Sequence, residues 1–258
     1  FFLAMAAVTL LPVPGGPSQP LRQLPGILLG GLILVAAGLA DDLIDLRPLV
    51  KLGAQLLAAV VAWTLGVAIH HLAFPWGGVD VGWLSLPLTV IWIVAVINAI
   101  NLIDGLDGLA AGVTLIALVA FFVIAPNDAP VTLVLGAAAG ATLGFLVYNL
   151  HPASIIMGDA GSMLLGFLLA AASVAIASPA AGSASAYVPL VVLALPLGDM
   201  AWTVLRRLIG GRSVFTPDAG HVHHRLLRLG LTHRDVVTLL HLVAAVLAGI
   251  GIGLNRLG

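Results

Sequence analysis

Apolar residues run along this chain in long blocks separated by short polar interruptions. A helix needs about 20 mostly apolar residues to cross a bilayer, and a backbone in lipid must satisfy its hydrogen bonds internally. Long blocks without strict alternation therefore predict an all-α, polytopic integral membrane helix bundle of about nine spans, the first of them incomplete. The blocks fall at about residues 1–12, 26–40, 49–70, 84–100, 109–125, 131–149, 163–178, 187–205 and 236–254.

The composition strengthens this picture. The 258 residues are 61% hydrophobic and only 8% charged, and the mean hydropathy is +1.17. Since soluble domains carry about 25% charged residues, a water-soluble globule is excluded. The absence of cysteine excludes disulfides and thiolate metal sites, and the net charge of −1 gives no reason to expect a nucleic-acid partner.

The pattern also bears on how the chain is organised. The first apolar run begins at Phe1 with no basic segment before it, which favours an interrupted span over a signal peptide. There is no internal repeat and no polar segment large enough for a second, soluble domain. We therefore expect one transmembrane domain, residues 1–258, lacking its N-terminal one or two spans.

Basic residues choose the orientation of the bundle. Consecutive spans place their connections on alternate sides, and the basic residues then divide eight to two. The positive-inside rule makes the richer side cytoplasmic, in a plasma (inner) membrane. That side holds Arg47, Lys51, Arg206, Arg207, Arg212, Arg225, Arg228 and Arg234, and the other holds Arg22 and Arg256.

The same side collects four polar clusters, the first of which is acidic. Asp41, Asp42 and Asp45 lie at the end of an apolar block, and Lys51 and Gln55 follow. At helical spacing the three carboxylates crowd one another, so they repel unless a cation lies between them or one takes a proton. Mg²⁺ is a suitable cation because it is hard and oxygen-seeking. The alternative is a solvated helix end, above all for Asp45.

The second cluster is a polar stripe. Asn98, Asn101, Asp104 and Asp107 recur every three residues, which places them along one helix face. Glycines at 105 and 108 permit a helix break or a close approach to a ligand. The alternative is that buried amides satisfy one another between helices.

The third cluster surrounds an aspartate between glycines. Asn149 is followed by Gly158-Asp159-Ala160-Gly161-Ser162 at the expected start of a helix. Free backbone N–H groups at such a point suit a phosphate. Taken alone, however, Asp159 is better explained as a helix cap.

The fourth cluster is basic and contains His221, His223, His224 and Arg225. Without cysteine or an HExxH pattern a zinc site is weakly supported, whereas arginine beside histidine suits anionic oxygens. The alternative is an anchoring loop on the cytoplasmic side. Nearby, Thr232 and Asp235 predict a helix cap, and Asp199 is expected to pair with Arg206.

Together the four motifs, in this order, resemble the polyprenyl-phosphate N-acetylhexosamine-1-phosphate transferases, over about residues 38–237. The spacing His221-x-His223-His224 is similar to the WecA/TagO branch rather than to the related MraY branch. The resemblance implies an enzyme, a phosphoglycosyltransferase. It would transfer N-acetylhexosamine-1-phosphate, expected to be GlcNAc-1-phosphate, from a UDP-amino sugar to undecaprenyl phosphate in the membrane lipid and release UMP. This is a first membrane step of cell-wall or surface polysaccharide synthesis.

The resemblance also implies roles for single residues. Asp41 and Asp42 would be the catalytic acids beside the reacting phosphates, and Asn101 and Asp159 would bind Mg²⁺, with Mn²⁺ as an alternative. The remaining residues would bind substrate, and a homodimer is left open. These substrate-binding residues are Asn98, Asp104, Asp107, Asn149, His221, His223, His224 and Arg225.

One departure and two rival functions stand beside this expectation. Asp218 is followed by Ala219 where the family commonly has arginine, which predicts weaker substrate binding. An intramembrane aspartyl protease needs only two aspartates and leaves the His/Arg cluster unexplained. A cation transporter needs acids near the membrane midplane, whereas these gather at one side.

Overall fold

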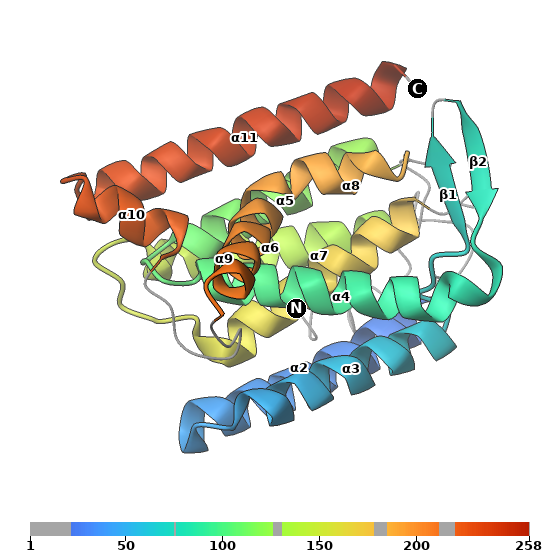
Figure 1. Cartoon of the computed structure of the whole chain (residues 1–258), viewed down its shortest axis with the longest axis horizontal. Helices are drawn as coiled ribbons and strands as arrows, with labels where there is room; N and C mark the ends of the chain where they lie inside the picture. Colours follow the sequence, from blue (N-terminus) through green and yellow to red (C-terminus); the bar gives the residue numbers. More distant parts are fainter. Residues whose placement is uncertain (1–21, 75, 126–130, 178–184, 212–219, 258) are drawn as a thin grey trace.

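The computed structural model of the protein describes residues 22–74, 76–125, 131–177, 185–211 and 220–257. Most of this part is helical, as Figure 1 shows, so the predicted helical membrane bundle is confirmed at that level. In chain order the elements are α2 (Leu24–Ile44), α3 (Pro48–Thr64), β1 (His71–Phe74), β2 (Gly77–Asp80), the short 3-10 helix η1 (Gly82–Leu84), α4 (Ser85–Ile103), α5 (Leu109–Ile124), α6 (Val131–Asn149), α7 (Gly158–Ile176), α8 (Tyr187–Val192), α9 (Ala194–Ile209), α10 (Val222–Arg228) and α11 (His233–Leu257).

Five helical stretches in the described ranges have the length and apolar composition to cross a membrane. They are α2, η1 with α4, α6, α7 and α11. Helices α3 and α5 are apolar but shorter, at 17 and 16 residues. The chain is thus a multi-pass membrane protein, while the predicted number of nine spans is not confirmed. The first expected block, 1–12, lies outside the described residues.

The block predicted at 187–205 is not one straight span. It forms α8 and α9, which meet at Leu193 and run in different directions (Figure 1). Pro196 explains the break, because proline lacks the N–H that would bond to the carbonyl four residues earlier, and its ring clashes with that carbonyl. The carbonyl belongs to Val192, the last residue of α8.

A small hairpin is the other departure from the expected all-helical fold. Strands β1 and β2 pair antiparallel, with His71 opposite Asp80 and Phe74 opposite Gly77. The His71 Nδ1 and an Asp80 carboxylate oxygen lie 2.8 Å apart across the pair. The hydrophobic pattern did not predict these strands, because four residues per strand are too few to show alternation clearly.

Helix α7 is the centre of the bundle. It packs against α2, α4, α5 and α6, and 72% of its most apolar window is buried, compared with 28% for α2 and for α6. Its core side chains include Phe167, which is fully buried. The position of α7 matters because Asp159 lies in its first turn.

Small residues let α2 approach α7 closely. A Cβ added to Gly38 would lie 2.3 Å from the Cα of Ala160, and one added to Gly30 would lie 2.4 Å from the Phe167 ring. Glycine at such positions allows helix backbones to come together in a membrane. The end of α2, which carries Asp41 and Asp42, is thereby held against the start of α7.

The connections that carry the polar motifs share one end of the bundle. The turns α2–α3 and α4–α5, the α6–α7 connection and α10 lie at this end in Figure 1, and the hairpin and the C-terminus lie at the other. We call the first of these the polar end.

The close approach at Gly38 can be tested directly. Gly38→Ala places a methyl group against the Ala160 backbone, which cannot move aside as a side chain can, so we expect a loss of about 1–3 kcal/mol in stability. Gly53→Ala is the matched control, because its added Cβ meets nothing within 4 Å and alanine favours the helix. Thermal unfolding in detergent measures both. A Gly38→Ala protein as stable as the control would contradict this packing.

Candidate active site

Three carboxylates lie together where the end of α2 meets the start of α7. Oxygens of Asp41, Asp42 and Asp159 are all within 4.8 Å of one another. The Nζ atom of Lys51, on α3, is 3.1 Å from Asp41 Oδ2 and 2.8 Å from Asp159 Oδ2. Lys51 therefore supplies a positive charge between two groups that would otherwise repel each other.

Asp42 makes its contacts with the backbone of α7. Its Oδ1 accepts the Asp159 N–H at 2.9 Å, and its Oδ2 accepts the Ala160 N–H at 3.4 Å. A carboxylate at a helix N-terminus satisfies N–H groups that have no partner within the helix, and it interacts favourably with the helix dipole. Asp42 thus caps α7 from a neighbouring helix, although Asp42 itself is exposed to solvent.

The two interpretations of the acidic cluster, a cation site and a solvated helix end, apply to different residues. The Asp41 side chain accepts the Leu46 N–H at 2.8 Å and faces Lys51, so it belongs to the cluster of three carboxylates. Asp45 is exposed and ends α2 in the left-handed conformation, with φ of 50°. For Asp45 the geometry fits the solvated helix end.

The polar stripe on α4 also divides. Asn101 donates from Nδ2 to Asp159 Oδ1 at 3.0 Å and to Ser162 Oγ at 2.9 Å, so it faces the cluster of three carboxylates. Asn98 lies one turn deeper and donates to Gln55 Oε1 at 2.7 Å. The alternative of buried amides that satisfy each other therefore describes Asn98, and not Asn101.

Helix α4 ends at Ile103, so the prediction that Asp104 and Asp107 continue the stripe along one helix face is wrong. Asp104 caps the helix instead, in an electrostatically unfavourable position. Burial, and then the negative charges of Asp159 and Asp107, raise the pKa of Asp104 to about 7. Its charge is thus sensitive to any cation that enters the site.

Asp107 and Gly108 form a hub that joins three segments. The Asp107 carboxylate accepts from His151 Nδ1 at 2.9 Å and from the Ala153 N–H at 3.1 Å. The hydrogen bond from His151 lowers the pKa of Asp107. The Gly108 N–H donates to Asn149 Oδ1 at 3.1 Å. Asp107 and the buried Asn149 therefore fix the α6–α7 connection to the α4–α5 turn.

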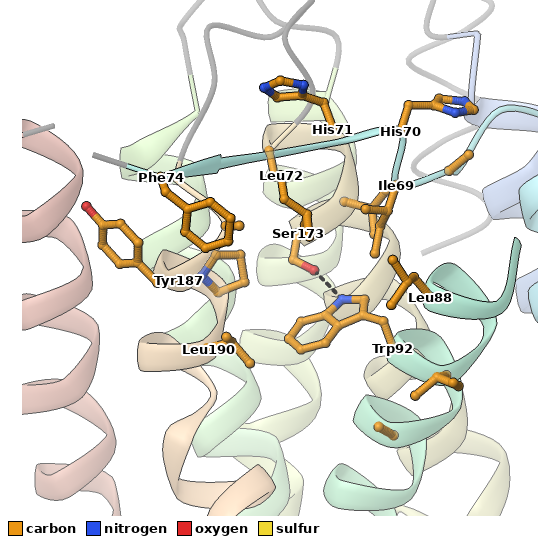
Figure 2. Close-up of a pocket in the computed structure, with 17 residues that line it drawn as sticks. Ile69, His70, His71, Leu72, Phe74, Leu88, Trp92, Ser173, Tyr187 and Leu190 are labelled. Atoms are coloured by element: carbon orange, nitrogen blue, oxygen red, sulfur yellow. Dashed lines mark hydrogen bonds between the residues drawn. The ribbon is translucent and has the colours of Figure 1, made fainter. Parts of the chain in front are cut away.

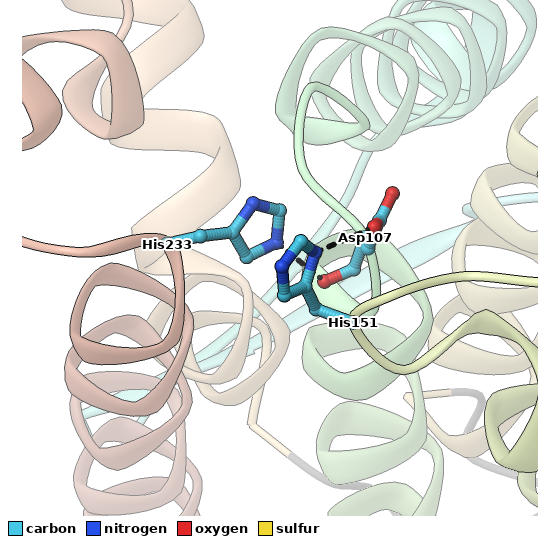
Figure 3. A group of neighbouring side chains, drawn as sticks. All are labelled: Asp107, His151 and His233. Atoms are coloured by element: carbon cyan, nitrogen blue, oxygen red, sulfur yellow. Dashed lines mark hydrogen bonds and ion pairs between the residues drawn. The ribbon is translucent and has the colours of Figure 1, made fainter.

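Two histidines of α11 hold the same hub. His233 lies 3.2 Å from the Asp107 carbonyl oxygen, and His241 lies 3.1 Å from that of Gly108. Figure 3 shows His233 beside His151, and their rings stack with centroids 4.1 Å apart and planes 22° apart. A metal ion lies near the plane of each imidazole that binds it, so rings stacked this way do not share an ion as they are placed. His151 and His233 therefore each hydrogen-bond to Asp107 and join the α6–α7 connection and α11 to the α4–α5 turn.

The histidine motif lies against the α4–α5 turn. A Cβ on Gly105 would fall 2.2 Å from His223 Nε2, so a larger residue at position 105 would force this ring to move. His223 is 1% exposed, and its two ring nitrogens have no hydrogen-bond partner among the described residues. Burial, with His224 and His221 nearby, lowers the pKa of His223 to about 4, so the ring is neutral at pH 7.

The structure thus brings the four motifs together, although it does not use every expected residue alike. Asp41, Asp42, Asn101 and Asp159 are in direct contact through one network, and His223 reaches the turn that carries Asp104. His224 is half-buried beside His223, and Arg225 is exposed on α10. Asp218 and Ala219 lie outside the described residues.

Several residues of this network were not predicted as site residues. Lys51 and Ser162 stand inside the recognised motifs, so their positions offered a signal. His151, His233 and His241 offered none, because their contacts join positions 44 to 133 residues apart.

A cavity of about 330 Å³ lies at the opposite end of the bundle, beside β1 (Figure 2). Its lining is mostly apolar and includes Leu72, Phe74, Trp92 and Leu190. None of the described residues that line it is an aspartate. Its chemistry differs from that of the polar end.

Several known proteins are similar to this chain over most of its length. A Bacillus subtilis protein named probable undecaprenyl-phosphate N-acetylglucosaminyl 1-phosphate transferase is 36% identical over 226 residues, or 86% of this chain and 63% of the relative. Decaprenyl-phosphate N-acetylglucosaminephosphotransferases of Mycobacterium leprae and Mycobacterium tuberculosis are 40% identical over 250 residues, or 87% of this chain. The matches cover 63% and 62% of their lengths, so the chain spans less than two thirds of these relatives.

A family model supports the same grouping. The model described as glycosyl transferase family 4 matches residues 24–177, which include the acidic cluster, the polar stripe and Asp159. The match covers more than half of the chain, and the expected resemblance to WecA/TagO-like transferases is confirmed. The protein therefore belongs to glycosyl transferase family 4.

Proposed function

We propose that the protein transfers N-acetylglucosamine-1-phosphate from a UDP-sugar to undecaprenyl phosphate and releases UMP. The observation that carries this proposal is the position of Asp159, which contacts Lys51 of the first motif and Asn101 of the second, while Asp42 caps its helix. Phosphoryl transfer depends mainly on positioning and on neutralising charge, and this is an arrangement built for both. The names of the relatives point to the same reaction.

The cluster of three carboxylates is suited to binding a divalent cation. Oxygens of Asp41, Asp42 and Asp159 lie within 4.8 Å of one another, and hard oxygen ligands suit Mg²⁺ or Mn²⁺. Asp159 and Asp41 would hold the ion, because both oxygens of Asp42 accept backbone N–H groups, whereas Asp41 uses only one oxygen in this way. A bound cation supplies positive charge to the donor diphosphate.

Asn101 has a different part in this proposal. Its amide nitrogen, rather than its oxygen, faces Asp159 and Ser162. In this orientation Asn101 aims the Asp159 carboxylate, and it becomes a ligand itself only after its amide group rotates. Asp41 is the catalytic acid best placed beside the reacting phosphates, and Asp42 acts by holding the start of α7.

The histidine motif is proposed to receive the donor. Burying an unpaired polar group costs about 1–3 kcal/mol, so a ligand that bonds the His223 ring nitrogens relieves that cost. His221, His224 and Arg225 would contact the diphosphate or the sugar. Asp104 and Asp107 lie on the adjoining turn, where they would hold the nucleotide.

The polar end is proposed to face the cytoplasm, where UDP-sugars are made. The eight-to-two division of basic residues supports this orientation. The acceptor lipid would then approach from the surrounding bilayer.

The rival functions account for less of the geometry. An aspartyl protease built on Asp159 and Asp199 needs these two to face each other, whereas Asp159 contacts Lys51 and Asn101, and Asp199 contacts His221. A transporter needs acids near the middle of the membrane, whereas Asp41, Asp42 and Asp159 lie at a helix end.

Removing the charge of Asp159 tests the proposal. Asp159→Asn should reduce Mg²⁺-dependent UMP release from UDP-N-acetylglucosamine and undecaprenyl phosphate by about 100-fold or more. Asp235→Asn is the matched control, because Asp235 is exposed and caps α11 through Thr232. Normal activity of Asp159→Asn would remove Asp159 from the mechanism. A wild-type protein that releases no UMP with any of several UDP-sugars would contradict the proposed reaction itself.

The pKa of Asp104 predicts a pH-dependent stability. The folded protein keeps this proton up to about pH 7, whereas the unfolded chain loses it near the ordinary value of 3.8. The contribution of Asp104 to stability therefore falls as pH rises from about 4 to 7 and then levels off. Asp104→Asn does not titrate, so the melting temperature of the variant should rise relative to wild type between pH 5 and pH 8.

Thermal unfolding in detergent without divalent metal measures this difference. Asp45→Asn, which changes an exposed aspartate at the end of α2, is the control and should follow the wild-type curve. Parallel curves for wild type and Asp104→Asn over the whole range would contradict the assigned pKa.

A further inference from the structure

Asp199 and His221 form a buried pair beside the histidine motif. Asp199 lies on α9, and its Oδ2 accepts from His221 Nδ1 at 2.8 Å. Its Oδ1 accepts the Val222 N–H at 2.8 Å. Each side chain is only 6% exposed. The expected pairing of Asp199 with Arg206 is thus replaced by two bonds to the start of α10.

The pair fixes which ring nitrogen can meet a ligand. A carboxylate can only accept, so His221 must donate from Nδ1, and Nε2 is the ring nitrogen that Asp199 leaves available. In its imidazolium form His221 then offers one N–H, at Nε2, to an anionic oxygen. The hydroxyl of Thr203, 3.5 Å from Nδ1, adds a second polar group on the same side of the ring.

The orientation of His221 extends to the rest of the motif. Its ring lies almost parallel to that of His223, with centroids 5.9 Å apart and planes 4° apart. His223 in turn packs on Gly105, next to Asp104. One carboxylate on α9 therefore sets the start of α10 and the histidine that begins it.

We infer that Asp199 is a positioning residue for donor binding, acting through His221. This inference rests on the proposed function and adds that the Asp199–His221 pair recognises the diphosphate of a nucleoside diphosphate sugar. Asp199 itself touches no substrate. Its loss acts by removing the acceptor that holds Nδ1–H and thereby orients the ring.

A double-mutant cycle tests the inference. Asp199→Asn and His221→Ala should each raise the KM for the UDP-sugar by about tenfold or more, with little change in the KM for undecaprenyl phosphate. The double variant should be no worse than His221→Ala, because Asp199 acts through that ring. Asp199→Glu should recover part of the affinity. Effects of the two single changes that multiply, or a fully active Asp199→Asn, would overturn the inference.

Binding separates this inference from the reaction. Calorimetric titration with UDP should show binding to wild type and to Asp235→Asn, and weakened binding to Asp199→Asn. His221→Gln keeps an N–H donor for Asp199, so it should retain the wild-type melting temperature and still lose affinity for UDP. Wild type that binds UDP without releasing UMP from UDP-sugars would contradict the reaction and leave the pair supported. Wild type that binds no UDP would overturn both.

Discussion

Repulsion among Asp41, Asp42 and Asp159 is the constraint on which the rest of the structure depends. Their oxygens lie within 4.8 Å of one another at the end of an apolar bundle, where unpaired charge is costly. The protein offsets this repulsion with Lys51, with the backbone N–H groups of α7 and with the Asn101 amide. These partners come from α3, α4 and α7, so one end of each of these helices must lie beside the end of α2. The lack of a side chain at Gly38 allows α2 to approach the start of α7 this closely.

A second layer of contacts holds the connections around these carboxylates. Asp107 and Gly108 receive bonds from the α6–α7 connection and from α11, and Asp199 ties α10 to α9. These contacts hold the turns and side chains that border the carboxylates, which is how a site built on loops gains a fixed geometry. The α6–α7 connection and the start of α10 are both held in place in this way.

The sequence predicts the layout of the helices better than the use of each polar residue. Hydrophobic blocks locate α2 to α7 and α11 with boundaries wrong by at most six residues, because lipid-facing helices must be long and apolar. The break near Pro196 had a signal that the apolar pattern concealed. Spacing places Asn98 and Asn101 on one face, but only the packing of α3 decides that Asn98 faces Gln55 while Asn101 faces Asp159. Likewise, Lys51 and His233 gain their partners from tertiary contacts that local periodicity does not encode.

The most direct test of the account is to locate the cation. Crystals of the protein soaked with Mn²⁺ and UDP would give an anomalous difference map, since manganese scatters anomalously and shares the oxygen preference of Mg²⁺. The account predicts one strong peak within coordinating distance of Asp159 and Asp41, with the diphosphate between that peak and His221. A peak at Asp107, His151 and His233, with none beside Asp159, would contradict it.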